Sequence, residues 1–289
     1  MSALAPALSR RQLGAFQVVG ASLGGLYTSL FIPELSALLD VGIPIRAAVG
    51  ARRLFLIHAH ADHVGGLSSF LAMRSMMTPH EPIELYAPAA ICEALQDHLN
   101  ALAALHGWPL EFTPCPLEVG EERQLDQRRW VRAIKTFHPV PSLGYLFFER
   151  RQKLLAAYRS RPGSELAELR RAGAPIFELR EEPLLAYLTD TLPEAVRRCP
   201  DALRAHALIV ECTFLDDRKP VKTARAGCHI HIDELIELAP LLENKKILLM
   251  HFSQLHSPAQ VRQIAEERLR PLFGERLELL LPEGERWWL

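Results

Sequence analysis

One loop of the chain concentrates residues that could bind metal ions. Three histidines and one aspartate fall within six residues, at His58, His60, Asp62 and His63. Neutral imidazole and carboxylate groups suit zinc and the neighbouring divalent metals, and this string holds enough ligands for two ions. The alternative is a polar loop of hydrogen-bonded histidines. Clustering four such groups without a metal costs free energy and gains nothing, so the string predicts a metal centre.

Four later residues of metal-binding types follow apolar runs that are typical of strands. They are His138, Asp190, Glu211 and His251. Each of them alone would suit an ordinary hydrogen-bonded position in a protein core. Strand ends in layered α/β folds, however, converge on one edge of the sheet, where sites are built. We therefore expect these side chains to meet the histidine-rich loop, which itself follows the apolar run 54–57.

Seven of these residues complete the ligand sets of two ions. The first ion takes His58, His60 and His138. The second ion takes Asp62, His63 and His251. The carboxylate of Asp190 gives one oxygen to each ion. Two ions about 3.5–4 Å apart activate water and stabilise both oxygens of an in-line phosphoryl displacement, so the predicted chemistry is hydrolysis. No serine-histidine-aspartate order, glycine-rich phosphate loop or nucleotide fingerprint in the sequence competes with it.

Two further histidines, His229 and His231, stand just before a predicted helix. One interpretation is a polar turn at the start of that helix. The functional interpretation makes one of them a proton donor or charge stabiliser opposite the metals, oriented by Glu211, as expected for a catalytic histidine. We assign that role to His229 and keep His231 as the alternative.

The elements that must position these residues alternate between strands and helices, which favours a layered α/β domain. Helices are predicted at 67–77, 88–105, 232–242 and 257–269. Strands are predicted at 18–20, 38–42, 54–57, 130–137, 145–148, 184–188, 207–210 and 246–250. Gly24 and Gly25 indicate a turn between the first two strands.

The overall charge limits how the protein could contact nucleic acid. The net charge is −1 and the pI is about 6.9, whereas nucleic-acid-binding proteins are usually basic. Such contact would need a local patch, and residues 149–163 supply one, with five basic residues against one acidic residue and a net charge of +4. The basic residues are Arg150, Arg151, Lys153, Arg159 and Arg161. The alternative is an ordinary solvated helical insertion.

The cysteines and the N-terminus bear on the cellular compartment. Five cysteines without a C-x-x-C pair argue against a disulfide framework or a cysteine zinc site and fit reduced thiols. The first fourteen residues lack the apolar core of a signal peptide, and no apolar stretch is long enough to span a bilayer. We expect a cytoplasmic protein without membrane contact.

Several segments of the chain carry a family resemblance that extends from about residue 16 to about residue 285. They are HAHADHVGG (58–66), FHPVPSLGY (137–145), YLTDT (187–191), VECTFLDD (210–217), CHIHIDEL (228–235) and LLMHFSQLHSP (248–258). With these segments the chain resembles the metallo-β-lactamase superfamily and, within it, the ribonuclease Z (tRNase Z) family in its short, plant-type form. It departs from that family at Cys228, where a glycine is usual. Residues 21–31 lack the P-x-K-x-R-N-type loop of many members.

The resemblance implies a four-layer αββα sandwich, the metallo-β-lactamase fold, as a single domain over 1–289. It implies a short, tRNA-gripping basic arm inserted at about 149–180, without the Gly-Pro-rich tip of longer forms. It also implies a homodimer and two Zn²⁺ ions per chain, with Mn²⁺ or another divalent metal as alternatives. The seven predicted ligands become zinc ligands, and Asp62 gains a catalytic role. Glu211 and His229 become the pair that assists the leaving group.

Two functions remain open from the sequence. The first is removal of the 3′ trailer from precursor tRNA, leaving a 3′-hydroxyl, with the basic arm contacting phosphates. The second is hydrolysis of a small phosphodiester or another small molecule, which the near-neutral charge and the short arm favour. A binding module without catalysis is a third interpretation, and the complete ligand set argues against it.

Overall fold

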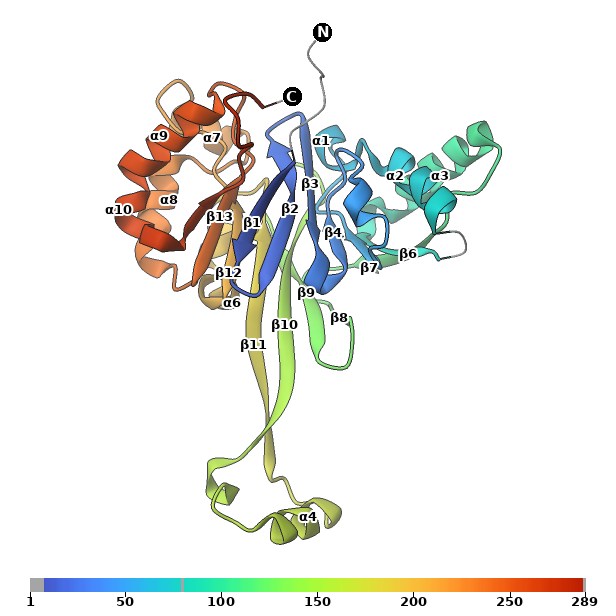
Figure 1. Cartoon of the computed structure of the whole chain (residues 1–289), viewed down its shortest axis with the longest axis vertical. Helices are drawn as coiled ribbons and strands as arrows, with labels where there is room; N and C mark the ends of the chain where they lie inside the picture. The colour runs from blue at the N-terminus through green and yellow to red at the C-terminus, as the bar shows by residue number, and fades with distance from the viewer. Residues whose placement is uncertain (1–7, 79–80, 288–289) are drawn as a thin grey trace.

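Two sheets of seven strands each form the centre of the molecule in the part of the chain that the structure describes (Figure 1). The structure is a computed structural model that describes residues 8–78 and 81–287, so part of the N-terminal segment considered for a signal peptide lies outside the described residues. The first sheet follows chain order: β1 (Ser9–Leu13), β2 (Phe16–Leu23), β3 (Tyr27–Ile32), β4 (Ala37–Leu39), β5 (Arg53–Phe55), β6 (Ile83–Pro88) and β7 (Phe112–Leu117). The second also keeps sequence neighbours side by side: β8 (Glu122–Gln124), β9 (Arg129–Lys135), β10 (Leu143–Leu154), β11 (Phe177–Leu188), β12 (Ala207–Glu211), β13 (Lys246–Met250) and β14 (Leu277–Leu279).

The inner faces of the two sheets share one apolar core. Phe55 of β5 stacks on Tyr86 of β6 with ring centroids 4.6 Å apart. The same ring meets Tyr145 and Phe147 of β10 edge to face, each at 5.1 Å. Because side chains alternate along a strand, Leu54 faces the other way, into a separate core beneath helices. The loop that follows β5 lies at the seam between the two sheets, where the Leu143 amide of β10 donates to the Ile57 carbonyl.

Helices cover the outer face of each sheet. On the first sheet, α2 (Leu67–Met77) and α3 (Ala89–His106) bury Phe70 and Leu99 against it. On the second, α8 (Ile232–Leu238) and α9 (Pro258–Arg268) do the same with Leu235 and Val261. The remaining short helices are α1 (Ala61–Val64), α4 (Gly163–Arg171), α5 (Glu194–Arg197), α6 (Pro200–Arg204), α7 (Val221–Ala226) and α10 (Arg270–Phe273). The predicted αββα sandwich is therefore confirmed.

Local chemistry explains where the helices begin and end. The side chain of Ser257 accepts a hydrogen bond from the Gln260 amide and, with Pro258 at the first helical position, starts α9. The helix predicted over 232–242 ends at Leu238 and continues only as a 3₁₀ turn, because Pro240 lacks the amide that an α-helix would need. None of the helices among the described residues combines the length and apolar character that a bilayer crossing needs.

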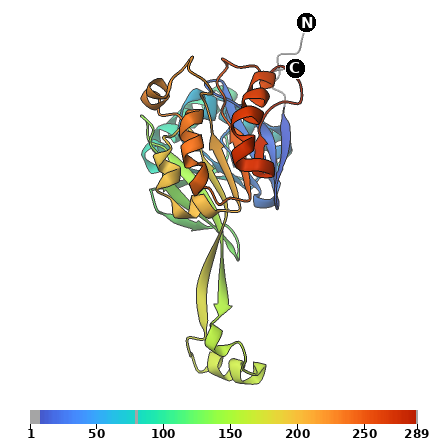
Figure 2. The same ribbon diagram turned by 90° about the vertical axis from the view of Figure 1, so that its left-hand side faces the viewer.

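The basic segment at about 149–180 forms a projection from the sandwich. β10 and β11 pair antiparallel from Tyr145 opposite Tyr187 to Leu154 opposite Phe177, and they leave the sandwich as a two-stranded stalk that ends at α4 (Figures 1 and 2). The predicted strands 145–148 and 184–188 cover only the buried part. Beyond Phe148 the residues become exposed, and the apolar pattern stops although the pairing continues.

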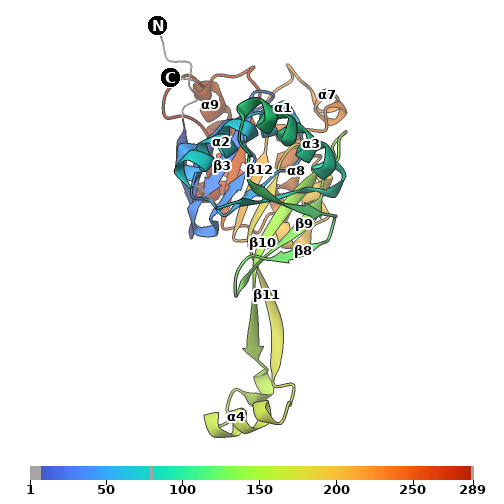
Figure 3. The ribbon, with the colours of Figure 1, turned by 90° about the vertical axis from the view of Figure 1, so that its right-hand side faces the viewer.

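The arm also lies farther from the metal loop than expected. The amide of Leu143, where β10 begins, donates to the carbonyl of Ile57 at 2.9 Å, beside the metal loop. β10 then runs away from that loop, and α4 lies at the far end of the stalk from α1 (Figures 1 and 3). The expectation that the basic residues project near the active face is therefore wrong for a single copy of the chain.

Candidate metal centre and active site

The histidine-rich loop connects β5 to α1 and is held by the backbone of residues 41 and 42. The amide of Val41 donates to the carbonyl of His63 at 2.8 Å. A side chain at Gly42 could not fit, because its Cβ would lie 2.0 Å from the carbonyl oxygen of Asp62. This close approach places Asp62 and His63 in the single turn of α1, where both side chains face the seam between the sheets.

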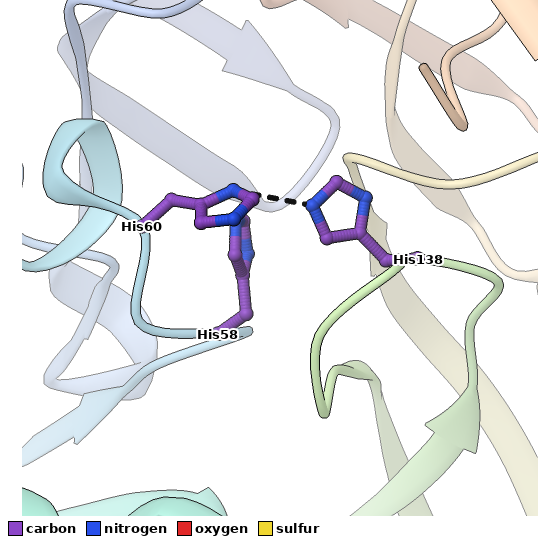
Figure 4. Close-up of side chains that lie close together, drawn as sticks. All are labelled: His58, His60 and His138. Carbon is purple, nitrogen blue, oxygen red and sulfur yellow. Dashed lines mark hydrogen bonds between the residues drawn. The ribbon is translucent and has the colours of Figure 1, made fainter. Parts of the chain in front are cut away.

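The first predicted ligand set comes together as three histidines. The ligand atoms of His58, His60 and His138 lie within 4.8 Å of one another. His60 Nδ1 and His138 Nε2 are 3.2 Å apart (Figure 4). His58 is fully buried beneath the pair, while His60 is exposed and His138 half-buried. The cluster thus opens to solvent on one side only.

The second predicted set forms beside the first. His63 Nε2 and His251 Nε2 lie 3.6 and 3.5 Å from Asp62 Oδ2. The same two nitrogens each lie 3.3 Å from Asp190 Oδ1. Two ligand atoms bound tetrahedrally to one zinc ion at about 2.1 Å are about 3.4 Å apart. The four side chains therefore have the spacing that one common ion needs.

Asp190 stands between the two sets. Its Oδ1 faces His63 and His251, and its Oδ2 lies 3.9 Å from His58 Nε2. Asp190 and His251 have φ angles of 48° and 59°, in the left-handed region that costs about 1–3 kcal/mol for a residue with a side chain. This backbone turns each side chain into the seam at the end of its strand.

The buried ring nitrogens supply a test of whether a metal fits. Five of them have no hydrogen-bond partner among the described residues: His58 Nδ1, His58 Nε2, His63 Nε2, His138 Nδ1 and His251 Nε2. Leaving buried polar atoms unpaired costs free energy. Three of these atoms, on His58, His63 and His251, face the shared carboxylate. The donor set is therefore suited to divalent metal ions.

Burial sets the pKa values of two histidines of the cluster, whereas charged neighbours set those of Asp190 and His63. Burial lowers the pKa of His58 to about 2 and that of His138 to about 4, so both rings are neutral near pH 7. Burial opposes the charge of Asp190, but the histidines around it outweigh this effect and lower its pKa. Burial also opposes the charge of His63, yet Asp190 and Asp40 raise its pKa well above the usual value. A metal ion held at His63 Nε2 would take the place of a proton on that ring.

An acid-histidine pair, the buried Glu211 and the half-buried His229, lies beside the cluster. His229 Nδ1 lies 3.0 Å from Glu211 Oε2, and its ring stacks on His251 with centroids 5.4 Å apart. Burial would lower the pKa of His229, but the charge and hydrogen bond of Glu211 raise it to about 9. The ring is therefore protonated at neutral pH, as a proton donor must be.

His231 has a different role in the fold. Its side chain is buried and accepts a hydrogen bond from the Asp233 amide, which caps the start of α8. Its other ring nitrogen lies 3.3 Å from the carbonyl oxygen of Asp216. Of the two histidines considered as proton donors, only His229 thus lies beside the cluster.

Sequence reasoning missed Asp40, which is fully buried behind the cluster. Its carboxylate lies 2.9 Å from His63 Nδ1 and accepts hydrogen bonds from the Tyr187 hydroxyl at 2.5 Å and the Ile57 amide at 2.9 Å. A carboxylate behind a ligating histidine fixes the ring so that its other nitrogen faces the ion. The signal was present, because Asp40 follows the apolar run of β4 in the same way that the predicted ligands follow their strands.

Thr213 was missed as well. Its hydroxyl bonds to Glu211 and lies 3.1 Å from His251 Nδ1. It therefore connects the acid-histidine pair to a predicted metal ligand. A threonine between two strands gives no comparable signal in the sequence.

The five basic residues of the arm are not brought to the cluster. Arg150 pairs with Glu122 and Glu181 and packs 4.4 Å from the Trp130 ring centroid. Of the other four, two form ion pairs and two do not. Arg151 and Arg161 bind the neighbouring carboxylates Glu149 and Glu165. Lys153 and Arg159 are exposed and have no ion pair within the described ranges. Arg150 thus braces the base of the arm, and only these last two cations remain unpaired.

Comparisons with known proteins agree with this geometry. A family model described as a beta-lactamase superfamily domain matches residues 37–252. The chloroplastic tRNase Z of Arabidopsis thaliana is 34% identical over 87% of this chain and 72% of its own length. Another tRNase Z of the same plant is 33% identical over 91% of this chain and 94% of its own length.

Solved structures share the fold at lower identity. The short form of human tRNase Z has a TM-score of 0.57 and 19% identity, covering 93% of this chain and 96% of its own. A metallo-beta-lactamase fold protein from Bacillus subtilis has a TM-score of 0.59 and 14% identity, covering 90% and 92%. These structures share the fold, and the family model and the plant relatives show that the chain belongs to the beta-lactamase superfamily and, within it, to the tRNase Z family.

Proposed function

We propose that this protein is a zinc-dependent endoribonuclease that removes the 3′ trailer from precursor tRNA. The observation that carries the proposal is the pairing of two ligand sets through Asp190, with the hydrogen-bonded pair of His229 and Glu211 beside them. This arrangement suits hydrolysis of a phosphodiester. Plant relatives that are 33–34% identical are named tRNase Z, which supports tRNA as the substrate.

Two Zn²⁺ ions, or two ions of Mn²⁺ or another divalent metal, would be held by the seven predicted ligands. His58, His60 and His138 would hold the first, and Asp62, His63 and His251 the second, with Asp190 shared. When bound, such ions polarise the phosphate and make water a strong nucleophile at neutral pH. Asp40 orients the His63 ring, and the Gly25 amide donates to Asp62 Oδ2 at 3.0 Å. The protein thus fixes ligand orientation from behind.

The side chains of the chain divide the proton transfers between them. The attacking water forms the new bond to phosphorus and gives up a proton, which Asp62 can accept. The bond from phosphorus to the 3′ oxygen of the tRNA breaks, and His229 donates a proton to that oxygen. Glu211 keeps His229 protonated through its 3.0 Å hydrogen bond. The products are a 3′-hydroxyl on the tRNA and a 5′-phosphate on the trailer.

The arm and the metal centre lie at opposite ends of the molecule (Figure 1), so an RNA bound by both would have to span the distance between them. Lys153 and Arg159, the two of the five predicted basic residues that have no ion pair within the described ranges, are our candidates for tRNA phosphates. They lie on the projection that points away from the metal centre of the same chain (Figure 1). In a homodimer, the arm of one copy could contact an RNA that is bound at the metal centre of the other copy. The homodimer and the cytoplasmic location stay predictions.

A cleavage assay that compares two substrates tests the proposal. A precursor tRNA and the small diester bis(p-nitrophenyl) phosphate would be compared by kcat/KM on the same metal-loaded protein. We expect a preference of orders of magnitude for the precursor, with a single cut at the 3′ end of the tRNA body. A preference for the small diester would instead support the small-molecule hydrolase.

A further inference from the structure

A groove on the second sheet lies next to the metal centre and outside every role assigned above. It has a volume of about 210 Å³ and is lined by Lys135, Phe137, Arg198 and neighbouring apolar side chains. Phe137 directly precedes the predicted ligand His138, and Arg198 follows α5 directly. One lining residue of the groove is therefore the chain neighbour of a predicted ligand.

Two cations that line this groove lie close to the same aromatic ring. Lys135 Nζ lies 5.4 Å and Arg198 Cζ lies 5.6 Å from the centroid of Phe137. Cation–π contacts at this distance fix long side chains that would otherwise move freely. Both cations are exposed, and neither has an ion pair within residues 8–78 and 81–287. They are therefore held in place and available to an anion.

A third cation of the groove, Arg132, differs from the other two because it is fully paired with carboxylates. Arg132 also lines it, but its guanidinium is bound by Glu122, Glu181 and Asp201 at 2.6–2.9 Å. Its charge is thus neutralised by the protein itself. The charges of Lys135 and Arg198 are not, although both sit in the same groove.

Hydrogen bonds connect the groove to the catalytic pair. The Phe137 amide donates to the Thr191 hydroxyl at 2.8 Å. The Thr191 amide in turn donates to Glu211 Oε1 at 2.6 Å. Thr191 follows the shared ligand Asp190. These bonds tie the backbone at Phe137, through Thr191, to the carboxylate that contacts His229.

We propose that this groove binds the RNA backbone next to the scissile bond, with one phosphate contacted by Lys135 and Arg198. The proposal rests on the proposed function. Phosphate contacts supply affinity and register without reading sequence. The groove offers two cations and an apolar floor that includes Ile134 and Ala195, and so it suits a sugar-phosphate chain of any sequence.

The test replaces both cations and compares them with a matched pair elsewhere. The variant is Lys135→Ala with Arg198→Ala. The control is Arg52→Ala with Lys245→Ala, which removes the same charge. Both control residues are exposed and precede β5 and β13, at the ends of those strands opposite the metal centre. Folding of all variants would be compared by thermal unfolding.

Two readouts separate RNA binding from chemistry. The ratio of kcat/KM for precursor tRNA over that for bis(p-nitrophenyl) phosphate should fall about tenfold or more in the groove variant. The salt dependence of RNA binding should lose about 0.7–0.9 units of slope for each phosphate contact removed. Lys135→Arg with Arg198→Lys, which keeps both charges, should restore most of the affinity. An equal loss in the control, or an unchanged ratio in the groove variant, would overturn the proposal.

Failure of the proposed function would give a different result. If the wild type prefers the small diester, tRNA processing is wrong whatever the groove does. The groove is then judged by fluorescence anisotropy with a labelled single-stranded RNA. Binding to the wild type that weakens only in the groove variant supports it, and RNA binding that is equal in all variants, or absent from the wild type, rejects it.

Discussion

The metal centre and the base of the arm are both rich in charged and polar side chains, but these side chains have partners at the base of the arm and lack them at the centre. At the centre, buried nitrogens of His58, His63 and His251 have no hydrogen-bond partner among the described residues. At the base of the arm, Arg150 is held by two carboxylates and an aromatic ring. The unpaired nitrogens of the centre face a shared carboxylate, as side chains that hold a metal ion would, whereas the paired arginine completes a structural contact. Substitutions at the two ends should therefore damage different properties.

The largest effect is expected from loss of a shared or second-set ligand. Asp62→Ala, His63→Ala or Asp190→Ala should abolish turnover, because the remaining side chains cannot hold both ions. Elemental analysis should show fewer metal equivalents than the roughly two per chain expected for the wild type, and a chelator should inactivate the wild type in the same way. A wild type that contains no transition metal and ignores the chelator would contradict the two-ion centre.

Loss of the proton donor should be the next largest effect. His229→Ala should slow cleavage by about 10²–10⁴-fold while the metal content stays at the wild-type level. If this variant loses metal instead, His229 is a ligand and its assignment as a donor is wrong. His231→Ala should chiefly lower the thermal stability, because that side chain caps α8.

The pH dependence sharpens the same point. Glu211 raises the pKa of His229 to about 9, so the donor is protonated below that pH and is lost as the pH rises through it. In a Glu211→Gln variant the charge that raises the pKa is gone, and the alkaline fall in kcat should begin at a lower pH than in the wild type. A pH profile that is merely scaled down, with the alkaline limb unmoved, would show that Glu211 does not act through the His229 proton.

Removal of the carboxylate behind His63 should have a smaller effect. Asp40→Ala should weaken metal affinity by about 10–100-fold, since the His63 ring loses the partner that orients it. The measurement is a competition titration of the metal with a chromophoric chelator. Activity at saturating metal should recover in part, unlike that of the ligand variants.

The arm should show the smallest effects, and of two kinds. Arg150→Ala should lower the free energy of unfolding by about 1 kcal/mol, because Glu122 and Glu181 lose a partner at a partly exposed site. Lys153→Ala with Arg159→Ala should leave the unfolding midpoint unchanged but raise KM for precursor tRNA and reduce its salt dependence. If both arm variants affected only stability, the arm would be a structural insertion.

The clustering of the predicted ligands was largely predictable because these residues occupy strand ends. His58, Asp190 and His251 each follow an apolar run, and parallel strands bring such ends together. Asp40 follows the same rule but belongs to no recognisable motif, and its importance depends on contacts with His63 and Tyr187 that are distant in sequence. Such a contact cannot be read from local pattern alone.

The arm was poorly predicted for a physical reason. Strands inside the sandwich alternate apolar residues between two buried faces, and this periodicity is what the sequence shows. Beyond Phe148 the strands have no buried face, so charged residues are tolerated while the backbone pairing continues. Cys228 is a departure from the family that the sequence showed but could not explain. Its φ of 59° lies in the left-handed region, which explains why a glycine is usual there.

The order of strands has a consequence for how the protein assembles. The first half of the chain builds one sheet and the second half builds the other, joined by an exposed turn in which the Glu121 amide donates to the Glu118 carbonyl. The two predicted ion sites draw ligands from both halves, so neither half can bind the pair of metals alone. A chain cut between Val119 and Gly120 and produced as two co-expressed fragments should regain metal and activity only when they dock. Uptake of metal would then be a signal that the two fragments have docked.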